Sequence, residues 1–207
     1  MDNQIIIAID AMGGENAPSK NIEGISIFLK KNRNKKDFFF NIYGDETLLT
    51  KEIKKYKITT NFYKIFHCST VVSDEETPLT AIKNSKDSSM WNSINSQTIF
   101  NSNITLSAGN TGVLFVVSRM LLKTIDSVSK PALAGLWPNK KNMNVVLDLG
   151  ANVECDENNL VDFSEMGAAL YKALFPQDSP KVALLNIGSE QIKGTETLKK
   201  AYAKLKD

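Results

Sequence analysis

The sequence predicts an α/β fold in which helices cover a mostly parallel sheet. Short β-branched segments alternate with helical segments along the chain, and this alternation is typical of parallel strands joined by crossover helices. The chain of 207 residues is 42% hydrophobic, which is enough apolar material for a core. Several strand ends are followed by polar turns that contain glycine, and ligands bind at that edge of an open parallel sheet.

The first half of the chain contains four expected strands. Residues 5–9 are apolar and β-branched, as in a buried strand. Pro18 suits the first turn of a helix, in which apolar residues then recur at helical spacing. The other expected elements are strands at 38–43, 62–66 and 104–106, a short helix around 48–53, and helical pieces at 78–83 and 88–96.

In the second half, residues 113–125 are apolar nearly all round, which predicts a helix that is buried on more than one side. The sequence shows no internal repeat, and residues 1–207 are expected to form a single domain. The remaining expected elements are strands at 132–137, 145–149 and 182–187, and helices at 160–174 and 195–206.

Composition and motifs give no support to several classes of protein. The formal net charge of +2 is too small to indicate nucleic-acid binding, and no aromatic and basic stripe indicates it either. Cys68 and Cys155 lack the spacing of a zinc site or a disulfide framework, and His67 is the only histidine. Dinucleotide and Walker A fingerprints are missing, so neither a metal nor a cofactor is expected. A signal peptide and a membrane-spanning run are also missing, which favours a cytoplasmic protein.

Five polar turns carry the candidate site. They lie at residues 10–14, 86–90, 107–112, 148–152, and 186–188 with 193–194. Most of them follow a predicted strand, and because the carboxyl ends of parallel strands converge on one edge of a sheet, we expect four of these turns to share one rim. Gly, Asn, Ser and Lys on such a rim suit an anion, and phosphate fits best.

The turn at 107–112 is the strongest of these signals. Gly109 and Gly112 allow the backbone to approach a ligand closely. Asn110 and Thr111 offer side-chain hydrogen bonds, and the following helix presents unpaired N–H groups and a positive dipole end. The alternative is that Thr111 simply caps this helix.

The other turns have structural alternatives as well. Lys86 stands beside a capped helix start, so it is either a cation for an anionic ligand or a surface lysine. Asp148 either orients a neighbouring lysine or caps its turn. Lys193 either places a point charge on a phosphate or forms an i,i+3 surface pair with Glu190.

The sequence resembles a known family at several motifs that occur in the right order. Residues 7–14 with 17–18 are similar to the opening of the bacterial phosphate acyltransferases that act on acyl carrier protein thioesters. The resemblance runs from Ile5 to the end of the chain. Its further motifs lie at 86–90, 107–112, 130–133, 147–155, 166–167, and 184–188 with 193–194.

The resemblance implies a three-layer α/β/α sandwich, distantly similar to phosphotransacetylases and isopropylmalate dehydrogenases. It implies transfer of a fatty acyl group from acyl-acyl carrier protein to inorganic phosphate, which gives acyl phosphate for phospholipid synthesis. It also implies a homodimer that associates peripherally with the membrane. The alternatives are a phosphotransacylase for short-chain acyl-coenzyme A, and an inactive binding fragment of either enzyme.

The matching turns supply the expected site residues. Lys193 and Asn110 are the expected catalytic residues. Family members are substantially longer, so the chain is expected to lack a C-terminal part that carries further site residues and the membrane contact. Ser189 stands where the family usually has an acidic residue. The expected substrate-binding residues are Asp10, Gly13, Gly14, Lys86, Ser88, Ser89, Ser107, Gly109, Thr111, Gly112, Asp148, Asn152 and Asn186.

Overall fold

The structure, a computed structural model, forms two compact units, which we call the first unit (Met1–Lys123) and the second unit (Thr124–Asp207). The expectation that residues 1–207 form a single domain stays a prediction. Ser189 and most of the helical piece expected at 78–83 lie outside the described residues. The structure describes residues 4–32, 37–73, 75–77, 80, 83, 85–99, 101–188, 190 and 193–206.

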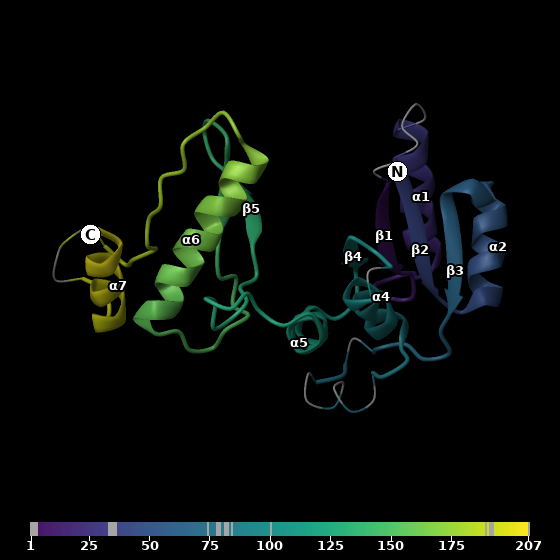
Figure 1. Cartoon of the computed structure of the whole chain (residues 1–207), viewed down its shortest axis with the longest axis horizontal. Helices are drawn as coiled ribbons and strands as arrows, with labels where there is room; N and C mark the ends of the chain where they lie inside the picture. Colours follow the sequence, from purple (N-terminus) through teal and green to yellow (C-terminus); the bar gives the residue numbers. More distant parts are fainter. Residues whose placement is uncertain are drawn as a thin grey trace. The chain divides into compact units, whose positions relative to one another are not determined.

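A four-stranded parallel sheet forms the centre of the first unit (Figure 1). Its strands correspond to the four that the sequence predicts in this half of the chain, with ends that differ by one residue. A short 3₁₀ helix, η1 (Thr60–Phe62), directly precedes the third strand of the chain. The order across the sheet is β3 (Tyr63–His67), β2 (Phe38–Gly44), β1 (Ile5–Asp10) and β4 (Ile104–Ser107).

Helices α1 (Ser19–Lys31) and α2 (Glu46–Tyr56) lie against one face of this sheet. Alternate residues of β1 and β2 point to that face, because successive side chains of a strand face opposite ways. Asp45 caps α2 by accepting a hydrogen bond from Leu48 N at 2.9 Å. The core on this face contains Ile7, Ile9, Ala11, Ile22, Ile25, Phe40, Ile42, Leu49 and Ile53.

Helix α4 (Ser89–Thr98) contacts β1, β2 and β4 on the opposite face, which completes a three-layer α/β/α arrangement. Helix α5 (Thr111–Leu122) packs on α4 through Val113 and Val117, which meet Met90 and Ile94. The predicted α/β fold class is therefore confirmed. Val113 and Val117 are the buried residues of α5 and lie one turn apart, so the expected burial on more than one side is not seen.

The second unit contains an antiparallel strand pair and two helices (Figure 1). Strands β5 (Gly135–Pro138) and β6 (Met143–Val146) are joined by a tight loop in which Asn139 N donates to Asn142 O at 2.8 Å. Helix α6 (Glu157–Leu174) begins at a capping box formed by Asp156, and α7 (Glu196–Lys206) packs against α6. Among the described residues, no helix is both long and apolar enough to cross a bilayer.

Two sequence predictions for the second unit are wrong in detail. The strands expected at 132–137 and 145–149 pair antiparallel, because a parallel pair needs a long crossover and the loop between them is short. The strand expected at 182–187 is absent, since this segment pairs with neither β5 nor β6. Leu185 is 90% exposed and Ile187 is 86% exposed, so the apolar pattern of this segment is not used for burial within the described structure.

Candidate functional site

The buried carboxylate of Asp10 is the centre of the candidate site in the first unit. Asp10 is the last residue of β1 and lies opposite Ser107, the last residue of β4. The Ser107 hydroxyl donates to Asp10 Oδ2 at 2.7 Å, and the Ser89 hydroxyl donates to Asp10 Oδ1 at 2.6 Å. One side chain therefore joins the carboxyl ends of two neighbouring strands to the first residue of α4.

The Gly13–Gly14 turn packs backbone to backbone on the turn that follows β4. A Cβ atom on Gly13 would lie 2.5 Å from Asp10 Oδ2 and 2.9 Å from Gly109 N. Gly14 has a φ of +91°, and a Cβ atom there would lie 2.7 Å from the carbonyl oxygen of Ala108. These positions leave no room for a side chain, which is the physical reason for two successive glycines here.

Two residues that the sequence interpretation missed hold these turns in place. Asn21, on α1, donates from Nδ2 to the carbonyl oxygens of Ala11 at 2.9 Å and Gly13 at 3.0 Å. Thr70 accepts a hydrogen bond from Ser89 N at 3.2 Å through its carbonyl oxygen. An amide side chain in the first turn of the helix after a Gly–Gly turn is the signal that could have identified Asn21, whereas the Thr70 contact has no local signal.

Helices α4 and α5 both begin beside the hydrogen bonds around Asp10. Ser88 caps α4 by accepting from Trp91 N at 3.1 Å. Asn110 caps α5 by accepting from Val113 N at 3.1 Å, so the cap is Asn110 and not Thr111. Neither helix has an acidic residue in its first turn, and both N-termini carry the positive end of a helix dipole. This arrangement suits an anion.

Asn110 has a structural role as well as its predicted catalytic one. Its Nδ2 donates to the carbonyl oxygen of Glu76 at 3.0 Å, while its Oδ1 caps α5. Thr111 and Gly112 begin the helix and are exposed. Because the first N–H groups of an α-helix have no partner within the helix, those of Thr111 and Gly112 are candidate donors to a ligand. Their binding to substrate stays a prediction, as does catalysis by Asn110.

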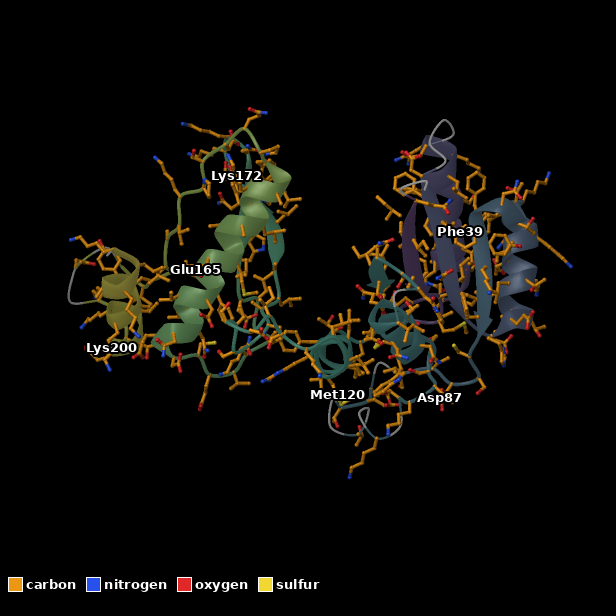
Figure 2. The ribbon with its side chains drawn as sticks, viewed as in Figure 1. Phe39, Asp87, Met120, Glu165, Lys172 and Lys200 are labelled. Carbon is orange, nitrogen blue, oxygen red and sulfur yellow. The ribbon has the colours of Figure 1, made fainter. Side chains whose placement is uncertain are left out.

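Lys86 lies in the turn that precedes α4. In this turn Ser88 N donates to the carbonyl oxygen of Ser85 at 2.9 Å. Lys86 and Asp87 are exposed, whereas Ser85 and Ser88 are buried. Figure 2 shows Asp87 at the end of the first unit where the parallel strands finish. Lys86 therefore comes from the correct end of the sheet, and its contact with an anion stays a prediction.

Asp148 and Asn152 form a closed turn in the second unit. Asp148 Oδ1 accepts from Leu133 N at 3.0 Å and from Ala151 N at 3.3 Å. Its Oδ2 accepts from the backbone and side-chain nitrogens of Asn152 at 2.8 and 3.0 Å. Partial burial raises the pKa of Asp148, but these hydrogen bonds outweigh it and hold the pKa below its usual value. The contacts match the capping alternative for Asp148.

Asn186 joins the two parts of the last predicted turn. Its Oδ1 accepts from Ile187 N at 2.8 Å, and its Nδ2 donates to the carbonyl oxygen of Lys193 at 3.4 Å. Lys193 N donates to the carbonyl oxygen of Glu190 at 2.9 Å, and the Lys193 side chain is exposed. None of the ion pairs between described residues joins Lys193 to Glu190.

Three predicted site residues of the second unit line one cavity. The cavity has a volume of about 720 Å³ and lies between β6, α6 and residues 180–186. Asp148, Asn152 and Asn186 contribute polar atoms to it, and much of the remaining wall is apolar. The structure therefore collects most of the predicted residues into two groups, one around Asp10 and one on this cavity, and Lys86 and Lys193 belong to neither. Contact between Lys193 and the turn at 107–112 stays a prediction.

The histidine and the two cysteines have structural surroundings. His67 accepts a hydrogen bond from Glu46 N at 3.2 Å through Nδ1, at the start of α2. Burial raises the pKa of the Cys68 and Cys155 thiols, and both are unpaired by disulfides. Within the described part of the chain, no three His, Cys, Asp or Glu side chains are grouped to hold a metal ion.

Comparison of the sequence with known proteins gives consistent matches. Phosphate acyltransferase from Pelagibacter ubique is 50% identical over 99% of this chain and 60% of its own length. The phosphate acyltransferases of Ehrlichia ruminantium and Wolbachia pipientis are 40% and 38% identical over 98% and 100% of this chain. The chain spans 60% of the length of each of these relatives.

The fold has a counterpart among solved structures. The phosphotransacetylase EutD from Staphylococcus aureus superposes with a TM-score of 0.66 at 15% sequence identity. The match covers 99% of this chain and 65% of that one, which supports the fold. The sequence model of a family described as fatty acid synthesis protein matches residues 5–207. Because that match covers nearly the whole sequence, the chain belongs to the fatty acid synthesis protein family.

Proposed function

We propose that the protein transfers a fatty acyl group from acyl-acyl carrier protein to inorganic phosphate, which releases acyl phosphate for phospholipid synthesis and free carrier protein. The observation that supports this most is the convergence of two helix N-termini and the Gly13–Gly14 turn around Asp10. Such a site suits an anion that the backbone binds directly. The names of the relatives, phosphate acyltransferase, support the same reaction.

Phosphate itself serves as the nucleophile in this mechanism. At neutral pH it is partly dianionic, so the protein has to desolvate it, hold it and direct one oxygen to the thioester carbonyl. Thr111, Gly112 and Lys193 are the proposed contacts for phosphate. Attack gives a tetrahedral oxyanion, which a lysine or a backbone N–H stabilises. The carbon–sulfur bond then breaks, and the thiolate leaves on the carrier protein.

Transfer of a short acyl group between coenzyme A and phosphate is the second candidate. The likeness of the fold to a phosphotransacetylase favours this alternative. The two reactions share the phosphate site and differ in the carrier of the thioester. A third possibility, a fragment that binds phosphate but does not turn over, differs from both in its lack of product.

An assay of acyl phosphate formation separates these candidates. The protein is mixed with inorganic phosphate and either a long-chain acyl-acyl carrier protein or acetyl-coenzyme A, and acyl phosphate is trapped with hydroxylamine. We expect product from the carrier protein thioester that increases with phosphate concentration and saturates. Product from acetyl-coenzyme A alone supports the second candidate. Phosphate binding without product from either thioester supports the binding fragment.

The proposal includes a homodimer in the cytoplasm that, when full length, associates peripherally with the membrane. Both features follow from the family resemblance. Sedimentation equilibrium measures the mass of the protein in solution, and flotation with anionic phospholipid vesicles measures its association with a membrane. We expect twice the chain mass in the first experiment, and we expect the full-length protein in the floating fraction in the second. Monomeric protein would contradict the dimer, and full-length protein that stays in the aqueous fraction would contradict the membrane association.

A further inference from the structure

We propose that Asp10 is a positioning residue, which aligns the phosphate-binding turn through Ser89 and Ser107 without contacting phosphate. This inference rests on the proposed phosphate site. It changes the role of three residues that the sequence interpretation assigned to substrate binding. Asp10, Ser89 and Ser107 become the support of the site, and the backbone at the start of α5 becomes its binding surface.

Burial and register place Asp10 behind the turns. Asp10 is 1% exposed, and Ser89 is also 1% exposed. Asp10 and Ser107 are register partners on adjacent parallel strands, whereas Ser89 reaches Asp10 from the start of α4. The Gly13 turn lies directly over the carboxylate, because a Cβ atom on Gly13 would be 2.5 Å from Asp10 Oδ2. A ligand on the exposed side of the turn is thus separated from the carboxylate by backbone.

A chain of hydrogen bonds leads from Asp10 toward α5. Ser107 donates its proton to Asp10 and accepts from Gly109 N at 3.2 Å. Gly109 precedes Asn110, the cap of α5. The orientation of the residues immediately before the helix is therefore set by the Ser107 hydroxyl, which Asp10 orients. Loss of the Ser107 hydroxyl breaks this series of hydrogen bonds, and loss of the Ser89 hydroxyl removes one of the two that hold Asp10. Either loss allows the turn before α5 to shift.

The donor count supports a positioning role for the serines. A serine hydroxyl has one proton, and Ser89 and Ser107 each donate theirs to Asp10. Neither hydroxyl can then donate to a phosphate oxygen. A carboxylate accepts hydrogen bonds and repels an anion, so direct contact between Asp10 and phosphate is unfavourable. Thr111 and Gly112 are exposed residues at the start of α5, where backbone N–H groups have no partner within the helix, so these N–H groups are the donors that suit the ligand.

Matched substitutions separate positioning from general stability. Ser89→Ala removes one hydroxyl from Asp10. Ser96→Ala is its control, because Ser96 is on the same helix, is 2% exposed, and donates to Ser93 O. The two positions lie seven residues apart, or about 10 Å along the helix. Ser107→Ala removes the second hydroxyl, and Ser107→Thr restores it at a strand position that suits a β-branched residue.

The measurements are the dissociation constant for inorganic phosphate by calorimetry, the KM for phosphate and for the thioester, and the melting temperature. We expect Ser89→Ala and Ser107→Ala to weaken phosphate binding by on the order of tenfold to a hundredfold, the size of effect that a misplaced binding group causes. The KM for the thioester should not change. Ser107→Thr should restore phosphate binding, and Ser96→Ala should lower the melting temperature while leaving phosphate binding intact.

Three outcomes would overturn the positioning role. The first is unchanged phosphate affinity in Ser89→Ala and Ser107→Ala, and the second is an equal loss of affinity in Ser96→Ala. The third is a protein without substitutions that does not bind phosphate. A protein that shows the expected pattern of phosphate affinities but forms no acyl phosphate from any thioester would support the positioning role and contradict the proposed function alone.

Discussion

Gly13 is the residue at which a single added methyl group would disturb the candidate site most directly. Gly13→Ala places a Cβ atom against Asp10 Oδ2 and Gly109 N. Gly109 N belongs to the backbone, and the Asp10 carboxylate is buried and held by two hydrogen bonds, so neither neighbour can move away easily. We expect a loss of about 1–3 kcal/mol in the free energy of unfolding, which is typical of overpacking, together with weaker phosphate binding. Chemical denaturation and a phosphate titration measure the two effects.

Gly24→Ala is the matched control for Gly13→Ala. Gly24 is exposed on α1, and a Cβ atom there would meet nothing within 4 Å. Alanine in a helix interior is favoured over glycine by about 0.5–1 kcal/mol, so this variant should be more stable and should bind phosphate normally. Equal stability changes in the two variants would contradict the close packing of the turns.

Asp148 should make the second unit sensitive to acid. Its pKa is lower in the folded protein than in the unfolded chain, where it is about 3.9. Its contribution to stability is therefore complete above that unfolded value and is lost as the pH falls through the lower folded value. We expect Asp148→Asn to be less stable than the unsubstituted protein at pH 7, and the difference to narrow below about pH 4.

Urea denaturation at pH 7 and pH 3 measures this dependence. Asp126→Asn, at an exposed turn of the same unit, supplies the control and should show little difference at either pH. A stability difference for Asp148→Asn that is the same at both pH values would show that the hydrogen bonds to Asp148 do not depend on its charge.

At the scale of elements, the start of α5 depends on Asn110. Asn110→Ala removes the cap from Val113 N and the hydrogen bond to the carbonyl oxygen of Glu76. Loss of an N-cap costs about 0.5–2 kcal/mol in stability. Thr111→Ala changes the next, exposed residue and should alter stability by no more than about 0.5 kcal/mol. Thermal melts of both variants decide which residue is the cap, and the reverse order would restore Thr111 to that role.

The sequence could predict the strands of the first unit because each combines an apolar segment with a neighbour that pairs with it. The same reasoning failed at 182–187, whose apolar pattern suits a strand but which has no pairing strand in the second unit. Strand formation depends on the partner as much as on local propensity. The antiparallel pairing of β5 and β6 was missed because alternation of elements alone does not fix strand direction.

In the candidate site too, local features could be predicted from the sequence and contacts between distant residues could not. Local composition could identify the turns at 10–14 and 107–112, since glycine and capping residues act locally. It could not show that Ser89 and Ser107 donate inward to Asp10, because these partners are 79 and 97 residues apart in the chain. Nor could it show that Asn110, and not Thr111, caps α5, because both residue types cap helices.

At the scale of the whole molecule, Lys193 is the lysine that the sequence predicts to be catalytic. Its side chain is exposed in the second unit. If Lys193 contacts the reacting phosphate, Lys193→Ala should raise the barrier by about 2–4 kcal/mol, or roughly two to three decades in rate. Stability should change by no more than about 0.5 kcal/mol.

Lys200→Ala is the control for Lys193→Ala. Lys200 is an exposed lysine on α7 of the same unit (Figure 2). Steady-state kinetics with varied phosphate and thermal melts of both variants make the comparison. An unchanged rate in Lys193→Ala would show that Lys193 is a surface lysine without a catalytic role, and an equal loss in Lys200→Ala would show that the effect comes from net charge.

The central claim is that the start of α5, supported by Asp10, binds the phosphate that attacks the thioester. The most direct test is a crystal structure of the protein soaked in inorganic phosphate. We predict a tetrahedral anion within hydrogen-bonding distance of the backbone nitrogens of Thr111 and Gly112, with Ser89 and Ser107 still donating to Asp10. An ordered anion bound only elsewhere, or one bound to the Ser89 and Ser107 hydroxyls, would contradict this account.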